Sequence, residues 1–396
     1  MNNHSSLYLR SKIFAILNKK ILIVTERRAD YSKFRPIIKE IEKSKKMDYC
    51  LVVTGSHLLK EYGNTINQIK QDKFKISSKF HMYPKNNKNT NAEMVRSFAK
   101  AVNEISKIVE KIKPNIILAG FDIGANFAAA IIGAHMNIVV AHLEGGEVTG
   151  TIDESIRHAT TKFSHIHFVT NSEAAKRIIK MGENPKLVFV VGNPSLDSIK
   201  NIKKISKEKL EKKFELDFSK PYVIILQHTV TSEIETVDKN IKKTIDAIKE
   251  SGIQSILIYG NADAGSRKIS KIIKNSKIKQ FSALSFDEYI NLLKNSAALI
   301  GNSSSGIMEA PYLRVPSINI GSRQSGRLRS SSVINVEYDK NKIKNAVKKA
   351  INDKKFLAKI KNTKNLYGNG NASKNIVSIL EKIDLKKIPI QKKMEY

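Results

Sequence analysis

The sequence predicts an α/β protein in which two Rossmann-like domains face each other across a cleft. Short runs rich in β-branched residues alternate with amphipathic helical stretches, which is the pattern of parallel βαβ units. The runs are almost entirely apolar, as expected for strands of a sheet that is covered on both faces. The length of 396 residues also exceeds the size at which one hydrophobic core usually stops growing.

Eleven runs are the predicted strands, and they fall into two series. The first series lies in 20–26, 49–55, 115–122, 138–146, 166–170 and 187–193, and the second in 222–229, 255–262, 298–304, 317–322 and 333–339. Lys220-Pro221 is a predicted hinge between the series. The predicted domains are 20–200 and 201–396, and the sequence leaves open whether the final helix, at about 374–385, returns to the first domain.

Two segments resemble membrane or export signals, and we interpret neither as one. In residues 1–19, read as an N-terminal extension, the apolar stretch is too short for a secretory signal and no small-residue cleavage site follows. Residues 115–142 are apolar enough to suggest a membrane helix. Asp122, Asn126 and Asn137 interrupt them, and β-branched clusters flank an alanine-rich middle. This pattern predicts a strand, a helix and a strand, and no membrane span.

Composition narrows the expected partners and compartment. The net charge of +32 comes mainly from lysines spread over helix faces without interleaved aromatics, so we expect no nucleic-acid partner. A basic interior would suit an anionic substrate. The single cysteine, Cys50, excludes an intrachain disulfide and fits a reducing compartment, for which the cytoplasm is the simplest assignment. No metal-ligand spacing, Walker lysine or GxGxxG motif is present, so no metal or cofactor is expected.

Ligands of such folds collect beyond the carboxyl ends of the strands. After the first strand, Arg28, Asp30 and Ser32 lie at a predicted helix start, where an arginine, a hydroxyl and free amides suit a phosphate. An N-capping Asp30 or Ser32 with a surface arginine is an equally good interpretation.

The densest polar feature is the acidic segment 142–158. Glu144 follows a strand and is followed by two glycines, Asp153 lies a few residues later, and Asp122 ends the preceding strand. Three carboxylates on one rim suit proton transfer, and their mutual repulsion is expected to raise the pKa of one of them. The alternative is that Thr151, Asp153 and Glu154 only cap the next helix. We expect the segment's other acids, Glu147 and Glu154, to be structural.

Strand ends of the second series offer an anion site. Ser303 and Ser304 lie in a glycine- and serine-rich turn that suits a phosphate, although a turn without a ligand would look the same. Glu309, expected about a turn inside the following helix, can accept a ribose diol. Arg323 and His228 also follow strands and are candidates to meet a diphosphate.

The chain resembles the hydrolysing UDP-N-acetylglucosamine 2-epimerases of sialic acid synthesis, including the epimerase half of the bifunctional animal epimerase/kinase, without a kinase domain. The resemblance spans about residues 21–373 and is carried by RADYSKFRPI, TGSHLLKEYGNTINQI, HLEGGEVTGTIDESIRHATTKFSHIH, LQHTVTSEI, NADAGS, IGNSSSGIMEA, PSINIGSRQSGR and LYGNGNAS. It implies a GT-B-like fold, a UDP-sugar substrate and a homodimer or homotetramer. The implied reaction eliminates UDP to give 2-acetamidoglucal and then adds water to give N-acetylmannosamine.

The resemblance also implies a role for each matching residue. The implied catalytic residues are Asp122, Glu144, Asp153 and His228. The implied UDP-binding residues are Arg28, Ser32, Ser303, Ser304, Glu309 and Arg323. His57, in TGSHL, matches a further active-site position.

The chain departs from the family's pattern beside Asp122. It reads GFDIGAN where the family usually has a GDRFD-like motif, so Ile123 and Ala125 stand where an arginine and an aspartate are expected. Gly260 also replaces a common proline. The altered segment keeps open a relative acting on UDP-N,N'-diacetylbacillosamine or a GDP sugar. A non-hydrolysing epimerase is another alternative, and so is a sugar-nucleotide-binding protein without catalysis, because fold alone does not prove activity.

Overall fold

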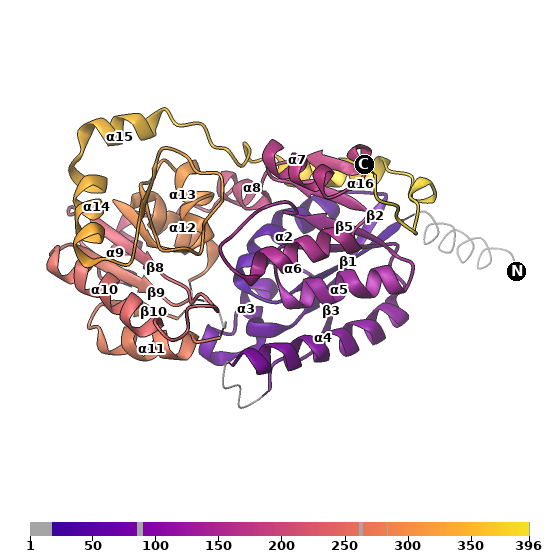
Figure 1. The fold of residues 1–396 in the computed structure, drawn as a ribbon, viewed down its shortest axis with the longest axis horizontal. Helices are drawn as coiled ribbons and strands as arrows, with labels where there is room; N and C mark the ends of the chain where they lie inside the picture. Colours follow the sequence, from indigo (N-terminus) through magenta and orange to yellow (C-terminus); the bar gives the residue numbers. More distant parts are fainter. Residues whose placement is uncertain (1–17, 85–89, 261–263, 283, 396) are drawn as a thin grey trace, which may run out of the picture.

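The fold contains two parallel sheets, each covered by helices on both faces (Figure 1). The computed structural model describes residues 18–84, 90–260, 264–282 and 284–395. Within these ranges every pairing between neighbouring strands is parallel. The α/β class and the two-sheet architecture predicted from the sequence are therefore confirmed.

The first sheet has seven strands in the described part of the chain, in the order β3-β2-β1-β4-β5-β6-β7. The strands are β1 Lys19–Thr25, β2 Met47–Val53, β3 Ile76–Lys79, β4 Ile116–Gly120, β5 Val139–Leu143, β6 Ile166–Val169 and β7 Val188–Val190. The helices of this half are α2 Arg28–Ile41, α3 Ile66–Gln71, α4 Asn91–Ile112, α5 Gly124–His135, α6 Ile152–Phe163 and α7 Ser172–Lys180.

The second sheet has six strands in the described part, in the order β10-β9-β8-β11-β12-β13. The strands are β8 Tyr222–Leu226, β9 Gln254–Ile258, β10 Lys279–Phe281, β11 Ala298–Gly301, β12 Ser317–Ile320 and β13 Val333–Val336. The remaining α-helices are α8 Pro194–Lys200, α9 Lys207–Phe214, α10 Val237–Glu250, α11 Ser266–Asn275, α12 Phe286–Asn295, α13 Glu309–Tyr312, α14 Lys340–Asn352, α15 Lys354–Lys361 and α16 Ala372–Lys382. Short 3-10 turns are η1 Gly55–Leu58, η2 Lys60–Tyr62, η3 Pro185–Leu187, η4 Ser304–Gly306 and η5 Leu385–Lys387.

Alternation along β1 shows why its middle, from Ile21 to Val24, is apolar throughout. Ile21 and Ile23 pack with α2 and α16 on one face of the sheet, whereas Leu22 and Val24 pack with α4 and α5 on the other. Successive side chains of a strand point to opposite faces, so a strand with helices on both sides has no polar face to offer. The second sheet is built in the same way, with α12 on one face and α10 and α14 on the other.

The apolar stretch 115–142 forms β4, α5 and β5, as predicted from its interruptions. Helix α5 is rich in small residues because it lies close against the sheet. A Cβ atom at Gly133 would lie 2.4 Å from Cγ2 of Val140, which leaves no room for a side chain there. Among the described helices, none has both the length and the apolar character needed to cross a bilayer.

The end of the chain lies on the first half of the molecule (Figure 1). Helix α16 packs against α2 and buries Ile376 and Leu380 in the first core. Lys19 fixes the last turn of α16, because its Nζ atom donates to the carbonyl oxygens of Leu380 at 2.7 Å and Ile383 at 2.6 Å. The helix begins and ends slightly earlier than the 374–385 expected from the sequence.

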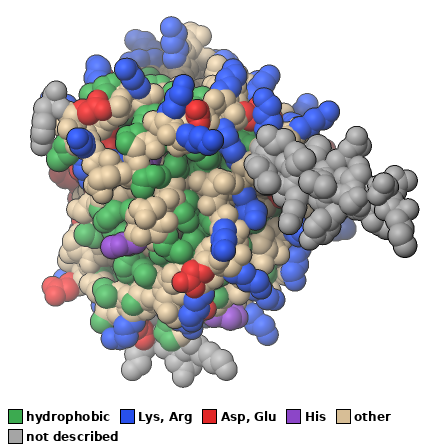
Figure 2. Space-filling view, turned by 90° about the vertical axis from the view of Figure 1, so that its right-hand side faces the viewer, with side chains coloured by type: hydrophobic (Ala, Val, Ile, Leu, Met, Phe, Trp, Pro, Cys, Tyr) green, Lys and Arg blue, Asp and Glu red, His purple; other side chains and the backbone are tan. Residues whose placement is uncertain are grey.

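The basic surface is dispersed. Figure 2 shows Lys and Arg side chains scattered around the edge of one face of the molecule, with hydrophobic and uncharged polar side chains between them. Acidic side chains occur among the basic ones on the same face. The excess of lysine therefore forms no single basic stripe on this face.

Candidate active site

A cavity of about 350 Å³ lies where the carboxyl ends of the two sheets meet. The halves touch directly at its edge: the amide of Gly150 donates to the carbonyl oxygen of Arg323 at 3.2 Å, and Nε of Arg327 donates to the carbonyl oxygen of Val148 at 3.1 Å. The structure brings all eleven site residues predicted from the sequence to this one cavity. They are Arg28, Ser32, His57, Asp122, Glu144, Asp153, His228, Ser303, Ser304, Glu309 and Arg323.

Asp122 follows β4 and is surrounded by cations. Its Oδ2 atom accepts a hydrogen bond from Arg157 of α6, and Nη2 of Arg27 lies 3.7 Å from its Oδ1 atom. Burial alone would raise the pKa of Asp122, but Arg157, Arg27, Arg327 and Lys33 together lower it to about 2. Asp122 is therefore not the rim carboxylate whose pKa is raised, because the four cations outweigh the effect of its burial.

Glu144 follows β5 and is held by a single cation. Its Oε2 atom accepts a hydrogen bond from Nζ of Lys33 at 2.7 Å, and the same ammonium lies 4.4 Å from the centroid of the Phe121 ring. The Glu144 side chain is only 3% exposed, and its other oxygen, Oε1, has no hydrogen-bond partner within the described residues. One carboxylate oxygen is thus fixed, and the other is left for a ligand or a proton.

The backbone is strained at both of these strand ends. Phe121 and Glu144 have φ values of 69° and 57°, in the left-handed region that non-glycine residues seldom adopt. The strain is held in place by the sheet, since the amide of Phe121 donates to Leu143 and the amide of Glu144 donates to Phe168. Such strain is commonly retained where it positions functional groups.

Asp153 lies in the first turn of α6 but does not cap it. The helix is capped by Thr151, whose Oγ1 atom accepts from the amide of Asp153 at 3.2 Å. The carboxylate of Asp153 lies 3.7 Å from Nη2 of Arg323 in the other half. The acids expected to be structural have structural contacts: Glu154 accepts from the amide of Thr149, and Glu147 accepts from Thr170 and Asn171.

The start of α2 supports the anion-site interpretation of its sequence, and the alternative of an N-capping Asp30 or Ser32 with a surface arginine is wrong. Asp30 is structural, because its carboxylate accepts hydrogen bonds from the amides of Glu26 and Arg27, although the N-cap residue is Arg27 rather than Asp30 or Ser32. Arg28 and Ser32 line the cavity, as expected for an anion site at a helix N-terminus. Burial lowers the pKa of Arg28.

His57 is buried, and both of its ring nitrogens have partners. Nε2 lies 3.0 Å from Oγ1 of Thr25, and Nδ1 lies 2.7 Å from Oγ1 of Thr65. Its imidazole therefore fixes the end of β1, and His57 also lines the cavity.

The second half contributes a short serine turn and a carboxylate. Ser303 caps η4, and Glu309 begins α13 instead of lying a turn inside a helix as expected. Oε1 of Glu309 accepts from Oγ of Ser195 at 2.6 Å, and Oε2 has no hydrogen-bond partner within the described residues. Burial raises the pKa of Glu309.

His228 follows β8 and is kept neutral at physiological pH. Its backbone is held by Asn302, which accepts from the amide at 2.6 Å and donates to the carbonyl oxygen at 2.9 Å. Burial and the nearby charges of Arg323, Arg27 and Arg28 hold the pKa of His228 well below its usual value. Gly260 leaves space for the imidazole, since a Cβ atom there would lie 2.9 Å from Nδ1 of His228. This contact gives a local reason for glycine at a position where a proline is expected.

Five cationic residues of the cavity were not among the predicted site residues: Arg27, Lys33, Arg35, Arg157 and Arg327. Arg157 carried a usable signal, because it lies four residues after Asp153 on a predicted helix and therefore shares its face. Lys33 pairs with Glu144 across 111 positions of sequence, and no local pattern reports such a distance.

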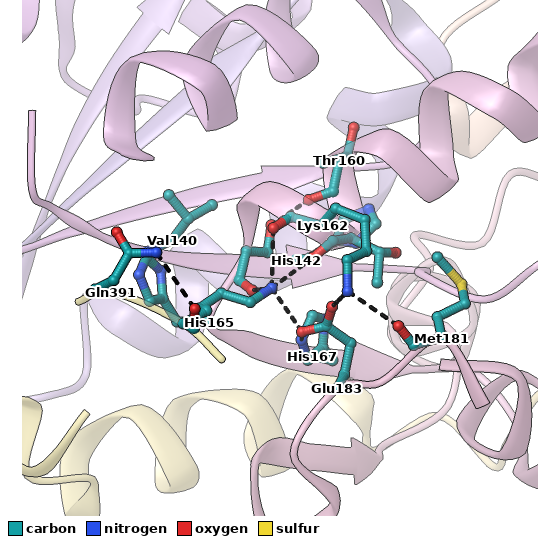
Figure 3. A network of polar contacts seen from close by, with 12 residues as sticks. Val140, His142, Thr160, Lys162, His165, His167, Met181, Glu183 and Gln391 are labelled. Atoms are coloured by element: carbon teal, nitrogen blue, oxygen red, sulfur yellow. Dashed lines mark hydrogen bonds and ion pairs between the residues drawn. The ribbon is translucent and has the colours of Figure 1, made fainter. Parts of the chain in front are cut away.

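A second polar cluster is centred on Glu183 and includes His167 of β6 (Figure 3). The buried carboxylate of Glu183 accepts from Nε2 of His167 at 3.2 Å and from Nζ of Lys162 at 2.7 Å, and Nζ of Lys392 lies 2.6 Å away. Lys392 also donates to the carbonyl oxygen of Ser164 at 2.5 Å. These residues do not line the cavity, and they tie the end of the chain to the strands beneath the site.

Known proteins resemble this chain in both sequence and fold. A sequence model described as UDP-N-acetylglucosamine 2-epimerase matches residues 39–381. The chain is 34% identical over 372 residues to the UDP-N,N'-diacetylbacillosamine 2-epimerase (hydrolyzing) of Legionella pneumophila, covering 93% of this chain and 97% of that protein. It is 34% identical over 343 residues to the UDP-N-acetylglucosamine 2-epimerase of Neisseria meningitidis serogroup B, covering 86% of this chain and 89% of that protein.

The crystal structure of UDP-GlcNAc 2-epimerase from Neisseria meningitidis bound to UDP-GlcNAc has the same fold. It superimposes with a TM-score of 0.79 over 92% of this chain and 100% of that chain, at 21% identity in the superposition. The two-domain arrangement expected from the motifs is thus that of a solved sugar-nucleotide enzyme, and the sequence match extends over most of both halves. The chain therefore belongs to the UDP-N-acetylglucosamine 2-epimerase family.

Proposed function

We propose that the protein is a hydrolysing UDP-N-acetylglucosamine 2-epimerase, which converts UDP-N-acetylglucosamine and water into N-acetylmannosamine and UDP. The observation that carries the proposal is the grouping of three carboxylates, Asp122, Glu144 and Asp153, with several cations around one cavity between the halves. Carboxylates suit proton transfer at C2, and cations suit a leaving diphosphate.

The proposed reaction has two stages, an elimination and a hydration. In the first, a base removes the proton from C2, the C1–O bond breaks, and UDP leaves with the electron pair to give 2-acetamidoglucal. In the second, the oxygen of water bonds to C1 and a proton is added to C2 on the opposite face, which gives N-acetylmannosamine. The C2 proton is weakly acidic, so its removal depends on a positioned base and on stabilisation of the departing UDP.

The three carboxylates are suited to different roles. A carboxylate with a pKa of about 2 is a weak base, so Asp122 is better suited to fixing Arg157 and Arg27 than to taking a proton. Glu144 has one oxygen held by Lys33 and one without a partner in the described residues, which suits a group that exchanges a proton with C2. Asp153 is the second proton carrier in this proposal.

The remaining cavity residues suit UDP. Arg28, Arg323 and the serine turn at Ser303 and Ser304 would bind the diphosphate, with Ser32 beside them. A neutral His228 can donate one hydrogen bond to a phosphate oxygen without adding charge. Oε2 of Glu309 is available to accept the ribose hydroxyls, while His57 supports the strand end behind Arg28.

A second substrate is supported by a specific observation. The Legionella pneumophila relative, matched over 97% of its length, is named a hydrolysing 2-epimerase of UDP-N,N'-diacetylbacillosamine. That sugar also has a 2-acetamido group and a UDP leaving group, so the same chemistry applies to it. The two substrates differ at C4 and C6 of the hexose, away from the reacting atoms.

A substrate panel in heavy water tests the proposal. Purified protein is incubated in D2O with UDP-N-acetylglucosamine, UDP-N,N'-diacetylbacillosamine and GDP-N-acetylglucosamine, and the products are followed by NMR and by assay of free nucleotide. We expect free UDP and N-acetylmannosamine carrying deuterium at C2 from the first substrate. If UDP is released faster from UDP-N,N'-diacetylbacillosamine than from UDP-N-acetylglucosamine, the bacillosamine derivative is the preferred substrate.

Two other outcomes contradict the proposal. Recovery of UDP-N-acetylmannosamine with no free UDP would identify a non-hydrolysing epimerase. Binding of UDP without turnover of any of the three sugar nucleotides would identify a binding protein.

A further inference from the structure

The turn between β4 and α5 lacks two charged residues that the resemblance leads us to expect, and the neighbouring strand end supplies the same charges. Ile123 and Ala125 stand at the two positions, and both are buried. We propose that Arg27 and Glu26, at the end of β1, act as a positioning pair: Arg27 replaces the cation missing at position 123, and Glu26 replaces the carboxylate missing at position 125. This inference rests on the proposed function.

Arg27 lies at the correct place to act on Asp122. It is the N-cap residue of α2, and its side chain reaches from the β1 end across to the β4 end. Its Nη2 atom lies 3.7 Å from Oδ1 of Asp122, on the opposite carboxylate oxygen from the one that Arg157 contacts. The two guanidinium groups therefore hold Asp122 from both sides, and each also lines the cavity.

Glu26 holds the other end of the same turn. It is 5% exposed, and its Oε2 atom accepts from the amide of Ala125 at 2.9 Å. That amide belongs to the first turn of α5, whose N-cap residue, Ile123, has no side chain able to accept a hydrogen bond. The carboxylate of Glu26 thus supplies from another strand the cap that the helix lacks in its own sequence.

The surroundings of Glu26 fit a buried carboxylate. Its Oε1 atom accepts from the hydroxyl of Tyr83 at 2.8 Å. A Cβ atom at Gly55 would lie 2.3 Å from Cγ of Glu26, and Gly55 has a φ of 64°, so only glycine leaves this space open. Burial raises the pKa of Glu26, and the charge of Arg27, the amide of Ala125 and the hydroxyl of Tyr83 oppose that rise. Burial is the largest of these effects, so the pKa of Glu26 stays above its usual value.

The charges at the end of β1 have opposite signs and act on each other. Arg27 contacts Asp122 directly, and the charge of Arg27 also lowers the pKa of Glu26. If the pair positions Asp122, loss of Arg27 will reduce kcat more than it weakens UDP binding. A role limited to folding would instead lower the amount of active protein without changing kcat per active site.

The decisive experiment is a rescue from the neighbouring strand. In Arg27→Ala, we expect kcat to fall by roughly 10- to 100-fold while the Kd for UDP changes by less than about threefold. The double variant Arg27→Ala/Ile123→Arg is expected to recover at least about a third of the fall in kcat, measured on a logarithmic scale. Arg96→Ala, an exposed arginine on α4, serves as the matched control with wild-type kcat.

Two results overturn the inference. Wild-type kcat in Arg27→Ala would show that Arg27 does not position the site. A well-folded Arg27→Ala/Ile123→Arg protein with no more activity than Arg27→Ala would show that Arg27 does not replace a cation at position 123. Active-site titration with UDP, together with circular dichroism, reports whether each variant is folded.

A stability cycle separates this inference from the proposed function. Wild-type protein that releases UDP from no sugar nucleotide contradicts the proposed function, but Arg27→Ala, Asp122→Asn and their double variant can still be compared by thermal unfolding. We expect the double variant to lose clearly less Tm than the sum of the single losses. Additive losses would contradict a contact between the two side chains, whatever the enzyme's activity. Glu26→Gln provides a second cycle, with Tyr83→Phe as its partner.

Discussion

Arg323 of the second half lies with its Nη2 atom 3.7 Å from Oδ2 of Asp153 of the first half. The backbone joins the same two segments, because the amide of Gly150 donates to the carbonyl oxygen of Arg323. Arg323, which we propose binds the diphosphate, and Asp153, which we propose carries a proton, are therefore in contact across the cleft. UDP bound to Arg323 would partly neutralise the guanidinium that lies next to Asp153. Nucleotide binding would in this way be coupled to the position of a reacting group.

We predict that Arg323→Met weakens UDP binding by roughly 10- to 100-fold, because an arginine contributes charge-assisted hydrogen bonds to phosphate that methionine cannot make. Isothermal titration calorimetry measures the change. Arg96→Met, an exposed arginine on α4, should bind UDP as tightly as the wild type. Unchanged affinity in Arg323→Met would remove Arg323 from the diphosphate site.

We predict that Asp122→Asn and Glu144→Gln each lower kcat by at least about 100-fold while UDP still binds. Both changes keep the size of the side chain and remove its charge, so they separate chemistry from packing. UDP release under saturating substrate gives kcat, and calorimetry gives the Kd for UDP. Glu110→Gln on the exposed face of α4 is the control. Wild-type rates in both variants would contradict the roles proposed for Glu144 in proton transfer and for Asp122 in fixing Arg157 and Arg27.

We predict that Lys33→Met lowers both Tm and kcat, because it leaves the buried carboxylate of Glu144 without its cation. Breaking one side of a buried ion pair is usually more destabilising than removing both charges. The double variant Lys33→Met/Glu144→Gln should therefore have a higher Tm than Lys33→Met alone. Thermal unfolding by calorimetry tests this order, and a lower Tm in the double variant would show that the pair is not coupled.

We predict that the stabilising effect of Glu183 depends on pH. Burial would raise its pKa, but His167, Lys162 and Lys392 lower it from 4.5 to about 2 in the folded protein. A carboxyl group with a depressed folded pKa stabilises fully above its unfolded pKa, and this contribution is lost as pH falls towards the folded value. The shift corresponds to about 3 kcal/mol at neutral pH.

Glu183→Gln tests the sign of this dependence. Its Tm deficit relative to the wild type should be large at pH 7 and should shrink as the pH is lowered from about 4.5 towards 3. Lys392→Met should show a deficit at pH 7 as well, since Lys392 ties the end of the chain to Glu183. A deficit in Glu183→Gln that stays constant over this range would show that the carboxylate charge does not stabilise the fold.

Local sequence patterns determined the fold class and the places where chemistry is concentrated. The strand and helix periods are properties of a few consecutive residues, which is why residues 115–142 could be read as β4, α5 and β5. The edge of a parallel sheet collects whatever follows its strands. For that reason Asp122, Glu144 and His228, which follow strands β4, β5 and β8, line one cavity as expected.

Tertiary structure decided the charge balance within that cavity. The pKa of Asp122 depends on Arg27, Lys33, Arg157 and Arg327, which come from separate segments, and no local pattern gives their distances. The return of α16 to α2, and the end of the chain at Glu183, are contacts between residues far apart in sequence. Sequence by itself therefore determined which side chains stand at the strand ends, because backbone periodicity is local. Only the tertiary structure decided which of them are paired, because Coulomb energies depend on distances in space.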